Sequence, residues 1–374
     1  MEMIILKKMK RLISSFTVAP ALAVALVAGS ARSAELPAVV PSVTESDLSA
    51  VYEQVKTPFK VGVILEPEPG KMLDNPNVFR FDDRWWMLYI QFDSKGYETH
   101  LAESEDLIHW KRRGCVFSRG AVGTWDVAQA DGGPSLMDAR WDGPNSLGTF
   151  GGRYWMTYIG GALEGYETDP LSIGIAYSST PTNSWNRART TPALATTDPD
   201  ARPFEKSTLY KSFVVDDPDR SLGARFVMYY NAKHEKKPQY ESIGMAVSDD
   251  MVNWRRYGSG PVVANGVPGR GFAISGDPMI RRIGDLWVMF YFGCAWKAGV
   301  KGAFDTFAVS RDLVRWTKWE GAPLVSPSEP WDAQHAHKPW VIRHDGVTYH
   351  FYCAVGSKGR VLALATSKPV AGSR

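Results

Sequence analysis

The chain has 374 residues and a formal net charge of +3, and 22% of its residues are charged. A charge this small excludes nucleic acid as a partner, because phosphate backbones demand clustered Lys and Arg. The three cysteines, Cys115, Cys294 and Cys353, have no His or Cys at metal-ligand spacing, so the sequence predicts neither a cysteine-based metal site nor a catalytic thiol.

Residues 1–31 are predicted to be a secretory signal. A basic start from Lys7 to Arg11 precedes an apolar core from Val18 to Ala28 and a small-residue cleavage site, Gly29-Ser30-Ala31. The core is too short to span a bilayer, and Ser30 stands where a lipoprotein anchor needs cysteine. We therefore expect a periplasmic or extracellular protein without a membrane anchor, in which residues 32–58 form an N-terminal extension.

Residues 59–374 repeat one pattern. An aromatic-rich run such as Trp85-Trp86-Met87-Leu88-Tyr89 recurs along the chain, and its centres are 69, 72, 61 and 62 residues apart. An interval of this size holds one four-stranded unit, which is typical of propellers. The sequence thus predicts an all-β fold, a five-bladed β-propeller with four-stranded antiparallel blades around a central funnel. The centres of the runs are Met87, Met156, Met228, Met289 and Phe351.

The last unit ends soon after its third strand. The segment from Phe59 to Leu65 has strand character and precedes the first unit. We expect this segment to pair as the missing outer strand and so to close the ring. The tryptophans of the predicted outer strands are expected to fill the space between blades.

In such a propeller, the loops that enter the first strands and the loops between second and third strands lie on the same face. Both sets of loops carry acids. The first set contains Asp74-Asn75-Pro76-Asn77, Gly276-Asp277-Pro278 and His337-Lys338-Pro339-Trp340, with Asp131 and Glu205 in the second and third units. The second set contains Tyr97-Glu98-Thr99, Tyr166-Glu167-Thr168, Tyr240-Glu241-Ser242 and Phe304-Asp305-Thr306.

A funnel lined by carboxylates, a histidine and aromatic residues has the groups needed to cleave a glycosidic bond. One acid protonates the leaving oxygen, and one carboxylate activates water or attacks carbon. Crowding raises the pKa of one carboxyl by repulsion between like charges. Asp-Pro and Asp-Gly are also ordinary turn residues, so each aspartate alone has a structural alternative. Repetition on one face favours a functional set.

The chain after residue 31 resembles the five-bladed β-propeller glycoside hydrolases, a group that includes families 32, 43, 117 and 130. Asp74-Asn75-Pro76-Asn77 resembles the Asn-Asp-Pro-Asn segment of family 32 with Asp and Asn exchanged, and Gly276-Asp277-Pro278 resembles its Arg-Asp-Pro segment. Asn75 therefore takes the register of that family's nucleophile. This exchange argues against a retaining mechanism.

The related families imply different catalytic groups. Similarity to family 43 implies Asp74 as the base, Asp131 as a supporting acid and Glu205 as the proton donor, whereas similarity to family 117 implies a histidine acid at His337. We expect Asp277 to complete the catalytic set by tuning pKa values. The expected substrate-binding residues are Asn75, Asp131, Glu98, Glu167, Glu241, Lys338 and Trp340, with Arg270 as a further contact; the three glutamates are also candidates for the acid.

The leading hypothesis is an exo-acting, inverting glycoside hydrolase that releases a terminal sugar from a plant or algal oligosaccharide or polysaccharide. One alternative is a phosphorylase like part of family 130, with a phosphate site at Arg281-Arg282 and from His335 to Lys338. The other is a non-catalytic carbohydrate-binding propeller. No cofactor is required, although carboxylates and carbonyls around the channel are able to hold a structural Ca²⁺.

Overall fold

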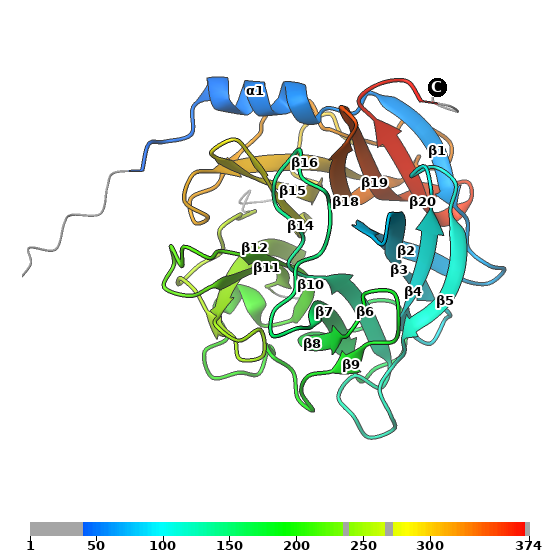
Figure 1. Cartoon of the computed structure of the whole chain (residues 1–374), viewed down its shortest axis with the longest axis vertical. Helices are drawn as coiled ribbons and strands as arrows, with labels where there is room; N and C mark the ends of the chain where they lie inside the picture. Colours follow the sequence, from blue (N-terminus) through cyan, green and yellow to red (C-terminus); the bar gives the residue numbers. More distant parts are fainter. Residues whose placement is uncertain (1–39, 235–238, 266–271, 371–374) are drawn as a thin grey trace, which may run out of the picture. The chain divides into compact units, whose positions relative to one another are not determined.

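The computed structural model describes residues 40–234, 239–265 and 272–370, and Figure 1 shows their strands arranged around a common centre. Strands dominate, as predicted. Within the described ranges the only α-helix is α1 (Glu45–Val55), which is too short to cross a membrane. The predicted signal and Arg270 lie outside the described residues.

Consecutive strands form four-stranded antiparallel sheets, which confirms the predicted unit. In each sheet, the aromatic-rich run is the second strand. The first sheet contains β2 (Met72–Phe81), β3 (Arg84–Phe92), β4 (Tyr97–Ser104) and β5 (Lys111–Phe117). The second contains β6 (Gln129–Pro134), β7 (Tyr154–Gly161), β8 (Ser172–Ser178) and β9 (Asn186–Arg187).

The next strands form one larger sheet of eight strands. It contains two antiparallel groups, which are joined because β12 and β14 pair in parallel between Gln239 and Phe272, Tyr240 and Ala273, and Glu241 and Ile274. The first group is β10 (Thr208–Asp216), β11 (Phe226–Lys233), β12 (Gln239–Ser248) and β13 (Arg255–Arg256). The second is β14 (Phe272–Ile283), β15 (Leu286–Cys294), β16 (Ala303–Ser310) and β17 (Thr317–Lys318).

The last sheet joins the two ends of the described chain. It consists of β18 (His335–His344), β19 (Val347–Gly356), β20 (Gly359–Thr366) and β1 (Phe59–Leu65). Strand β1 pairs antiparallel with β20, so Phe59–Leu65 supplies the outer strand as predicted. Contacts of β2 with β18 and β20 complete a closed circuit of sheets.

Three outer tryptophans each follow a turn of the same conformation. Trp110, Trp254 and Trp316 each donate the indole N–H to the carbonyl three residues earlier, at 3.0–3.1 Å. The residue that accepts has a positive φ in each case, at Leu107, Met251 and Leu313. All three rings pack against the hydrophobic core, so their role is structural, as predicted.

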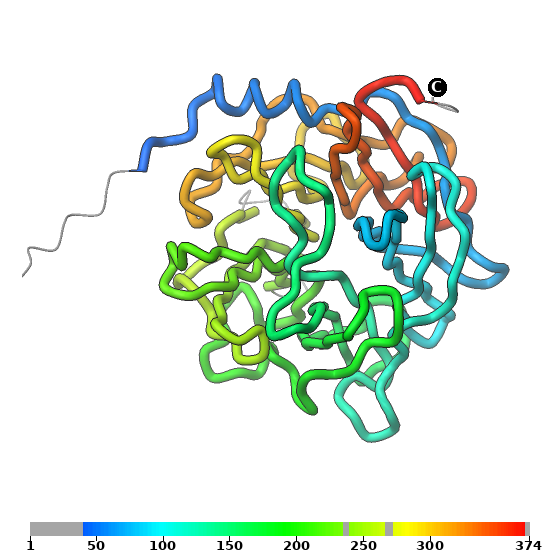
Figure 2. Tube along the Cα trace, viewed as in Figure 1, coloured from blue at the N-terminus to red at the C-terminus, as the bar shows by residue number. Residues whose placement is uncertain are grey.

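The connection between β6 and β7 crosses one end of the ring (Figure 2). Its Asn145 carbonyl accepts from the Arg80 backbone N–H at 2.9 Å, and the Asn145 amide donates to the Arg343 carbonyl at 2.9 Å. The buried Arg281 guanidinium donates to Asn145 Oδ1 at 2.8 Å and to the carbonyls of Asp138 and Arg140. The connection between β6 and β7 therefore links strands β2, β14 and β18.

Candidate active site

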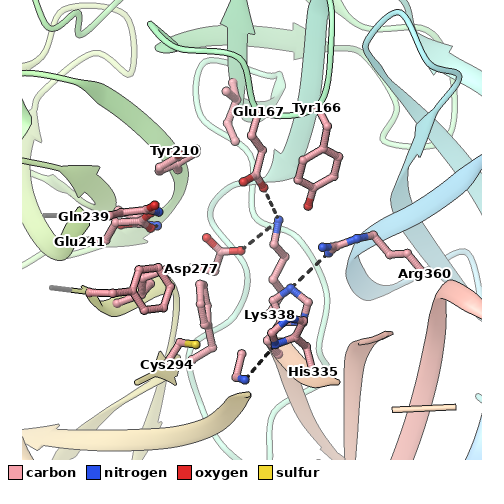
Figure 3. A pocket seen from close by; sticks show the side chains of 17 residues that line it. Tyr166, Glu167, Tyr210, Gln239, Glu241, Asp277, Cys294, His335, Lys338 and Arg360 are labelled. Atoms are coloured by element: carbon pink, nitrogen blue, oxygen red, sulfur yellow. Dashed lines mark hydrogen bonds and ion pairs between the residues drawn. The ribbon is translucent and has the colours of Figure 1, made fainter. Parts of the chain in front are cut away.

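Three first strands share a bulge at an X-Pro pair. The registers of β2, β14 and β18 shift at Asn75-Pro76, Asp277-Pro278 and Lys338-Pro339. The residues before these prolines have φ values of 54°, 53° and 63°, a left-handed conformation that costs about 1–3 kcal/mol for a residue other than glycine and that clusters at functional sites. A bulge redirects the side chain, and Asp277 and Lys338 both enter one cavity (Figure 3).

The cavity has a volume of about 180 Å³ and two unlike walls. One wall is apolar and contains Ile274, Phe292, Cys294 and Ala303, which form a small hydrophobic cluster. The other is polar, and its ionisable or hydroxyl-bearing side chains come from separate sheets. They are Tyr166, Glu167, Tyr210, Glu241, Asp277, His335, His337, Lys338 and Arg360.

Lys338 lies at the centre of the polar wall. Its Nζ is 3.0 Å from Asp74 Oδ2, 3.1 Å from Glu167 Oε1 and 3.8 Å from Asp277 Oδ2. Burial alone would lower the pKa of Lys338, but Asp74 and Glu167 outweigh burial and raise it well above its usual value. The ammonium group is therefore charged, and it holds these carboxylates close together.

Asp74 lies beneath the cavity and does not line it. Its Oδ2 also accepts from Arg360 at 3.0 Å and from the Tyr166 hydroxyl at 3.2 Å. Burial raises the pKa of Asp74, yet Lys338 and Arg360 more than offset burial and hold the pKa well below its usual range. A carboxylate with such a low pKa is a weak base, so this arrangement does not favour the predicted role of Asp74 as the base.

His337 has both ring nitrogens engaged. Nδ1 is 3.1 Å from the Cys353 carbonyl and Nε2 is 3.1 Å from an Arg360 nitrogen. Because a carbonyl only accepts and a guanidinium only donates, Nδ1 carries the proton and Nε2 does not. Burial, followed by Arg360, lowers the pKa of His337 well below its usual value. The imidazole is therefore neutral, which disfavours the predicted role of His337 as proton donor.

Glu241 lines the cavity and is almost completely buried. Its carboxylate accepts from Asn231 Nδ2 at 2.9 Å and from Gln239 Nε2 at 2.6 Å. Burial is the largest influence and raises the pKa of Glu241 to about 7, against the opposing effect of these two donors. Glu241 therefore has the protonation behaviour of a general acid near neutral pH.

Glu167 is the more accessible carboxylate of the polar wall. Its side chain is 29% exposed, compared with 4% for Asp277. Burial raises the pKa of Asp277, even though Lys338 and Lys211 oppose this shift. Glu167 thus has both contact with a cation and access to water.

Asn75 and Asp131 form a buried pair beside this site. Asn75 Nδ2 donates to Asp131 Oδ1 at 2.7 Å. Burial raises the pKa of Asp131 to about 7, although Lys338 and the Asn75 hydrogen bond lower it. Neither residue lines the cavity, so they support the site and do not reach a sugar there.

The structure separates Glu205 and Trp340 from the cavity. Glu205 is fully buried and accepts from Arg202, Arg256 and Tyr230, so both its oxygens are occupied. Trp340 is also fully buried, and its Nε1 donates to the Val78 carbonyl at 2.7 Å. These positions do not favour the predicted roles of Glu205 as proton donor and of Trp340 as a sugar contact.

The Tyr-Glu-Thr motifs are alike in sequence but not in register. Glu241 pairs with Lys233, five residues after Met228, whereas Glu98 pairs with Gln91, four residues after Met87. A shift of one residue turns a side chain to the opposite face of a sheet. Glu98 therefore does not line the cavity, and its nearest cation is Arg119, 3.6 Å away.

Three residues of the polar wall were not predicted as site residues: Arg360, Tyr166 and Tyr210. Arg360 belongs to β20, which carries no acidic motif. Tyr166 adjoins Glu167 in a motif that the sequence did single out. Tyr210 lies where β10 changes register, the same place as the X-Pro bulges, but without a proline to mark it.

Neither of the alternative ligand sites assembles at the cavity. Arg281 and Arg282 do not line it, so they do not complete a phosphate site. Asp74, His337 and Cys353 have the donor atoms for a cation, but an Arg360 nitrogen lies 3.0, 3.1 and 3.3 Å from these donors. The guanidinium occupies the position of the cation, so this group does not fit Ca²⁺.

A scan against models of protein families finds no match, and neither does a search of curated proteins. Two solved structures, however, are similar over most of the chain. A structure of BT0996 in a complex with RGII is 43% identical, with 88% of this chain and 97% of that protein covered and a TM-score of 0.84. A structure described as a glycoside hydrolase is 42% identical, with the same coverage and a TM-score of 0.83.

The chain belongs to the β-propeller glycoside hydrolases. This glycoside hydrolase also shares its fold with a thermostable family-43 enzyme, which is 15% identical, with 82% of this chain and 96% of that enzyme covered and a TM-score of 0.59. Enzymes of families 117 and 130 share the fold as well. The predicted resemblance and the predicted enzyme class are both confirmed.

Proposed function

We propose that this glycoside hydrolase removes one terminal sugar from a plant or algal oligosaccharide, with inversion at the anomeric carbon, and that it does so in a periplasm or outside the cell. A glycan like RGII is the first substrate to test, because the structure of the relative BT0996 is a complex with RGII. The observation that carries the proposal is a small cavity whose wall holds an acid with a raised pKa, Glu241, and an accessible carboxylate, Glu167.

Glu241 is the proton donor in this proposal. It transfers its proton to the glycosidic oxygen as the bond from that oxygen to the anomeric carbon breaks. Glu167 removes a proton from the water that attacks the same carbon, and Lys338 Nζ, 3.1 Å from Glu167 Oε1, fixes the position of that carboxylate. The products are the free terminal sugar and the shortened oligosaccharide, and one water molecule is consumed.

Asp74 and Arg360 act on the reaction through other side chains. Asp74 fixes Lys338 and Arg360 by a single oxygen, Oδ2. Arg360 in turn holds His337 neutral by donating to its Nε2. These are positioning residues, because none of their contacts requires that they touch the bond that breaks.

The shape of the cavity supports exo cleavage. Its volume of about 180 Å³ is below the roughly 300–1,000 Å³ of typical ligand clefts. A site of this size accepts a chain end more readily than the interior of a polysaccharide.

Inversion is supported by Asn75. An amide stands in the register of the family 32 nucleophile, and its Nδ2 is committed to Asp131. An amide that donates to a buried carboxyl does not attack carbon. Water activated by Glu167 is therefore the nucleophile of the proposal.

We also propose that the ring has five blades. The eight-stranded sheet divides into two antiparallel groups that touch through three parallel residue pairs, and each group begins with a register shift, at Tyr210-Lys211 and at Asp277-Pro278. Each group therefore resembles a complete blade. An experimental structure with another number of blades would contradict this proposal.

The test is incubation of the purified enzyme with oligosaccharides from RGII and with a panel of aryl glycosides, with and without phosphate. We expect a free terminal sugar at a rate that phosphate does not change, and proton NMR of the first product should show the anomer opposite to that of the substrate. Release of a sugar phosphate would overturn hydrolysis, and an unchanged anomer would overturn inversion.

A further inference from the structure

The first sheet carries a second group of ionisable side chains, away from the cavity. Glu98 and His100 are two residues apart on β4, so they point to the same face of the sheet. Cys115 on β5 is the direct cross-strand partner of His100. A carboxylate oxygen, an imidazole nitrogen and a thiol sulfur of these three residues lie within 4.8 Å of one another.

The backbone of β5 places the thiol on this face. The register of β4 and β5 shifts on both sides of the His100–Cys115 pair, and Gly114 has a φ of 100°, which residues with a Cβ rarely adopt. The bulge turns Cys115 toward His100 on the outermost strand of the sheet. The sequence alone did not indicate this pair, because His100 and Cys115 are fifteen positions apart.

A buried amide oxygen beside the group lacks a hydrogen-bond partner. Gln91 is 5% exposed and pairs in register with Glu98, and its Nε2 is 3.4 Å from His100 Nε2. Its Oε1 is buried without a hydrogen-bond partner, although an unpaired buried oxygen costs about 1–3 kcal/mol. This oxygen is a free ligand atom on the face that carries Glu98, His100 and Cys115.

The side chains of the group already have polar neighbours. Cys115 Sγ lies 3.3 Å from the Ser118 hydroxyl oxygen, and coordination would remove the thiol proton. Arg119 is 3.6 Å from Glu98 and is shared with Asp93, which it contacts at 2.8 Å.

We propose that Glu98, His100 and Cys115 bind a divalent cation of the zinc class. Sulfur, nitrogen and carboxylate donors are the ligands that Zn²⁺ takes, at bond lengths that place tetrahedral donors roughly 3.3–3.8 Å apart. The three donor atoms lie within 4.8 Å of one another, and binding would draw them together to this spacing. Gln91 Oε1 or a water molecule supplies the fourth position, and the Cys115 proton goes to solvent.

Such an ion would fasten the edge of the sheet. The residues of β5 from Lys111 to Cys115 are exposed, and the strand has no further strand beyond it in the sheet. A metal bridge from Cys115 to His100 ties this strand to β4. Because a ligand that binds only the folded state raises stability, the ion should protect the protein against unfolding.

The test measures metal binding and not catalysis, so its outcome is independent of the proposed glycosidase reaction. Metal-free protein is titrated with Co²⁺ and followed by absorbance, since a Co²⁺–thiolate bond gives a charge-transfer band in the near ultraviolet. The variants are Cys115→Ser and His100→Ala. The control is His109→Ala, which alters an exposed histidine that pairs with Asp106 at 2.7 Å.

We expect one Co²⁺ per chain with the thiolate band in the wild type and in His109→Ala, and loss of the band in Cys115→Ser and His100→Ala. One equivalent of Zn²⁺ should displace Co²⁺ and raise the melting temperature of the wild type and of His109→Ala alone. Absence of the band from the wild type, or equal bands in all four proteins, would overturn the site. Circular dichroism checks that each variant is folded.

Discussion

Glu205 and Glu241 are both buried glutamates, but their hydrogen-bond donors differ. Around Glu205, both carboxylate oxygens accept from charged donors, including Arg256 Nε at 2.5 Å, and the group lies away from the cavity. Glu241 instead accepts from two neutral amides and lines the cavity. Arginine contacts occupy both oxygens of Glu205, whereas burial beside neutral donors raises the pKa of Glu241 to about 7 and leaves it able to exchange a proton near neutral pH.

The sharpest way to break this comparison is Glu241→Gln. Loss of the proton donor should lower kcat by about 10²- to 10⁴-fold, with a small change in KM, because the amide keeps the shape of the side chain. Steady-state kinetics on the substrate found in the glycoside panel measure both constants. The exposed Glu105→Gln is the matched control and should retain wild-type kcat. Wild-type kcat in Glu241→Gln would remove this residue from the role of acid.

Glu205→Gln tests the other side of the comparison. The amide leaves Arg202 buried without a carboxylate partner, whereas Arg256 keeps Asp198 and Asp200, and loss of the buried Arg202 pair should lower the free energy of unfolding by about 3–5 kcal/mol. Urea unfolding measures this loss, and kcat per folded molecule should stay near that of the wild type. If stability held and kcat fell as in Glu241→Gln, Glu205 would be the acid that the sequence predicted.

The pH dependence of kcat/KM sharpens the assignment of the acid. Glu241 donates only when protonated, and its pKa is raised to about 7 by burial. The reactive fraction therefore falls tenfold for each pH unit above about 7, so kcat/KM should have a descending basic limb there. Residual activity in Glu241→Gln should lack this limb. A wild-type profile that stays flat from pH 6 to pH 9 would contradict the assignment.

The smallest expected effect is on stability. The folded pKa of Glu241 is about 7, above its usual 4.5, so its contribution to stability is complete below pH 4.5 and is lost as the pH rises through 7. Glu241→Gln has no charge to bury. The melting temperature of Glu241→Gln minus that of the wild type should therefore be larger at pH 8 than at pH 5. Calorimetry of both proteins at these two pH values measures this difference. A constant difference would show that Glu241 is not held with a raised pKa.

Much of the fold could be predicted from the sequence, because the period of the aromatic runs indicates one four-stranded antiparallel group for each interval. The position of Phe59–Leu65 also followed, since the last unit was one strand short and the first segment had the pattern to complete it. The X-Pro pairs marked the bulges that carry Asp277 and Lys338 into the cavity, although their left-handed φ values were visible only in the structure.

The partners of the site could not be predicted in the same way. Glu98 and Glu241 have similar sequence surroundings, and only the strand register decides which of them faces the cavity. The resemblance to family 43 implied Glu205 as the proton donor, and its contact with Arg256, 51 residues later in the chain, was visible only in the structure. Arg360 has no motif of its own, and its role depends on the distances to Asp74 and His337.

The most direct test of the central claim is a crystal structure of Glu241→Gln with an RGII-type oligosaccharide. We predict that the terminal sugar occupies the cavity, with the glycosidic oxygen about 2.6–3.2 Å from the side chain at position 241. Glu167 should lie on the opposite face of the sugar ring. A sugar bound elsewhere, or a glycosidic oxygen that faces another carboxylate, would contradict the account.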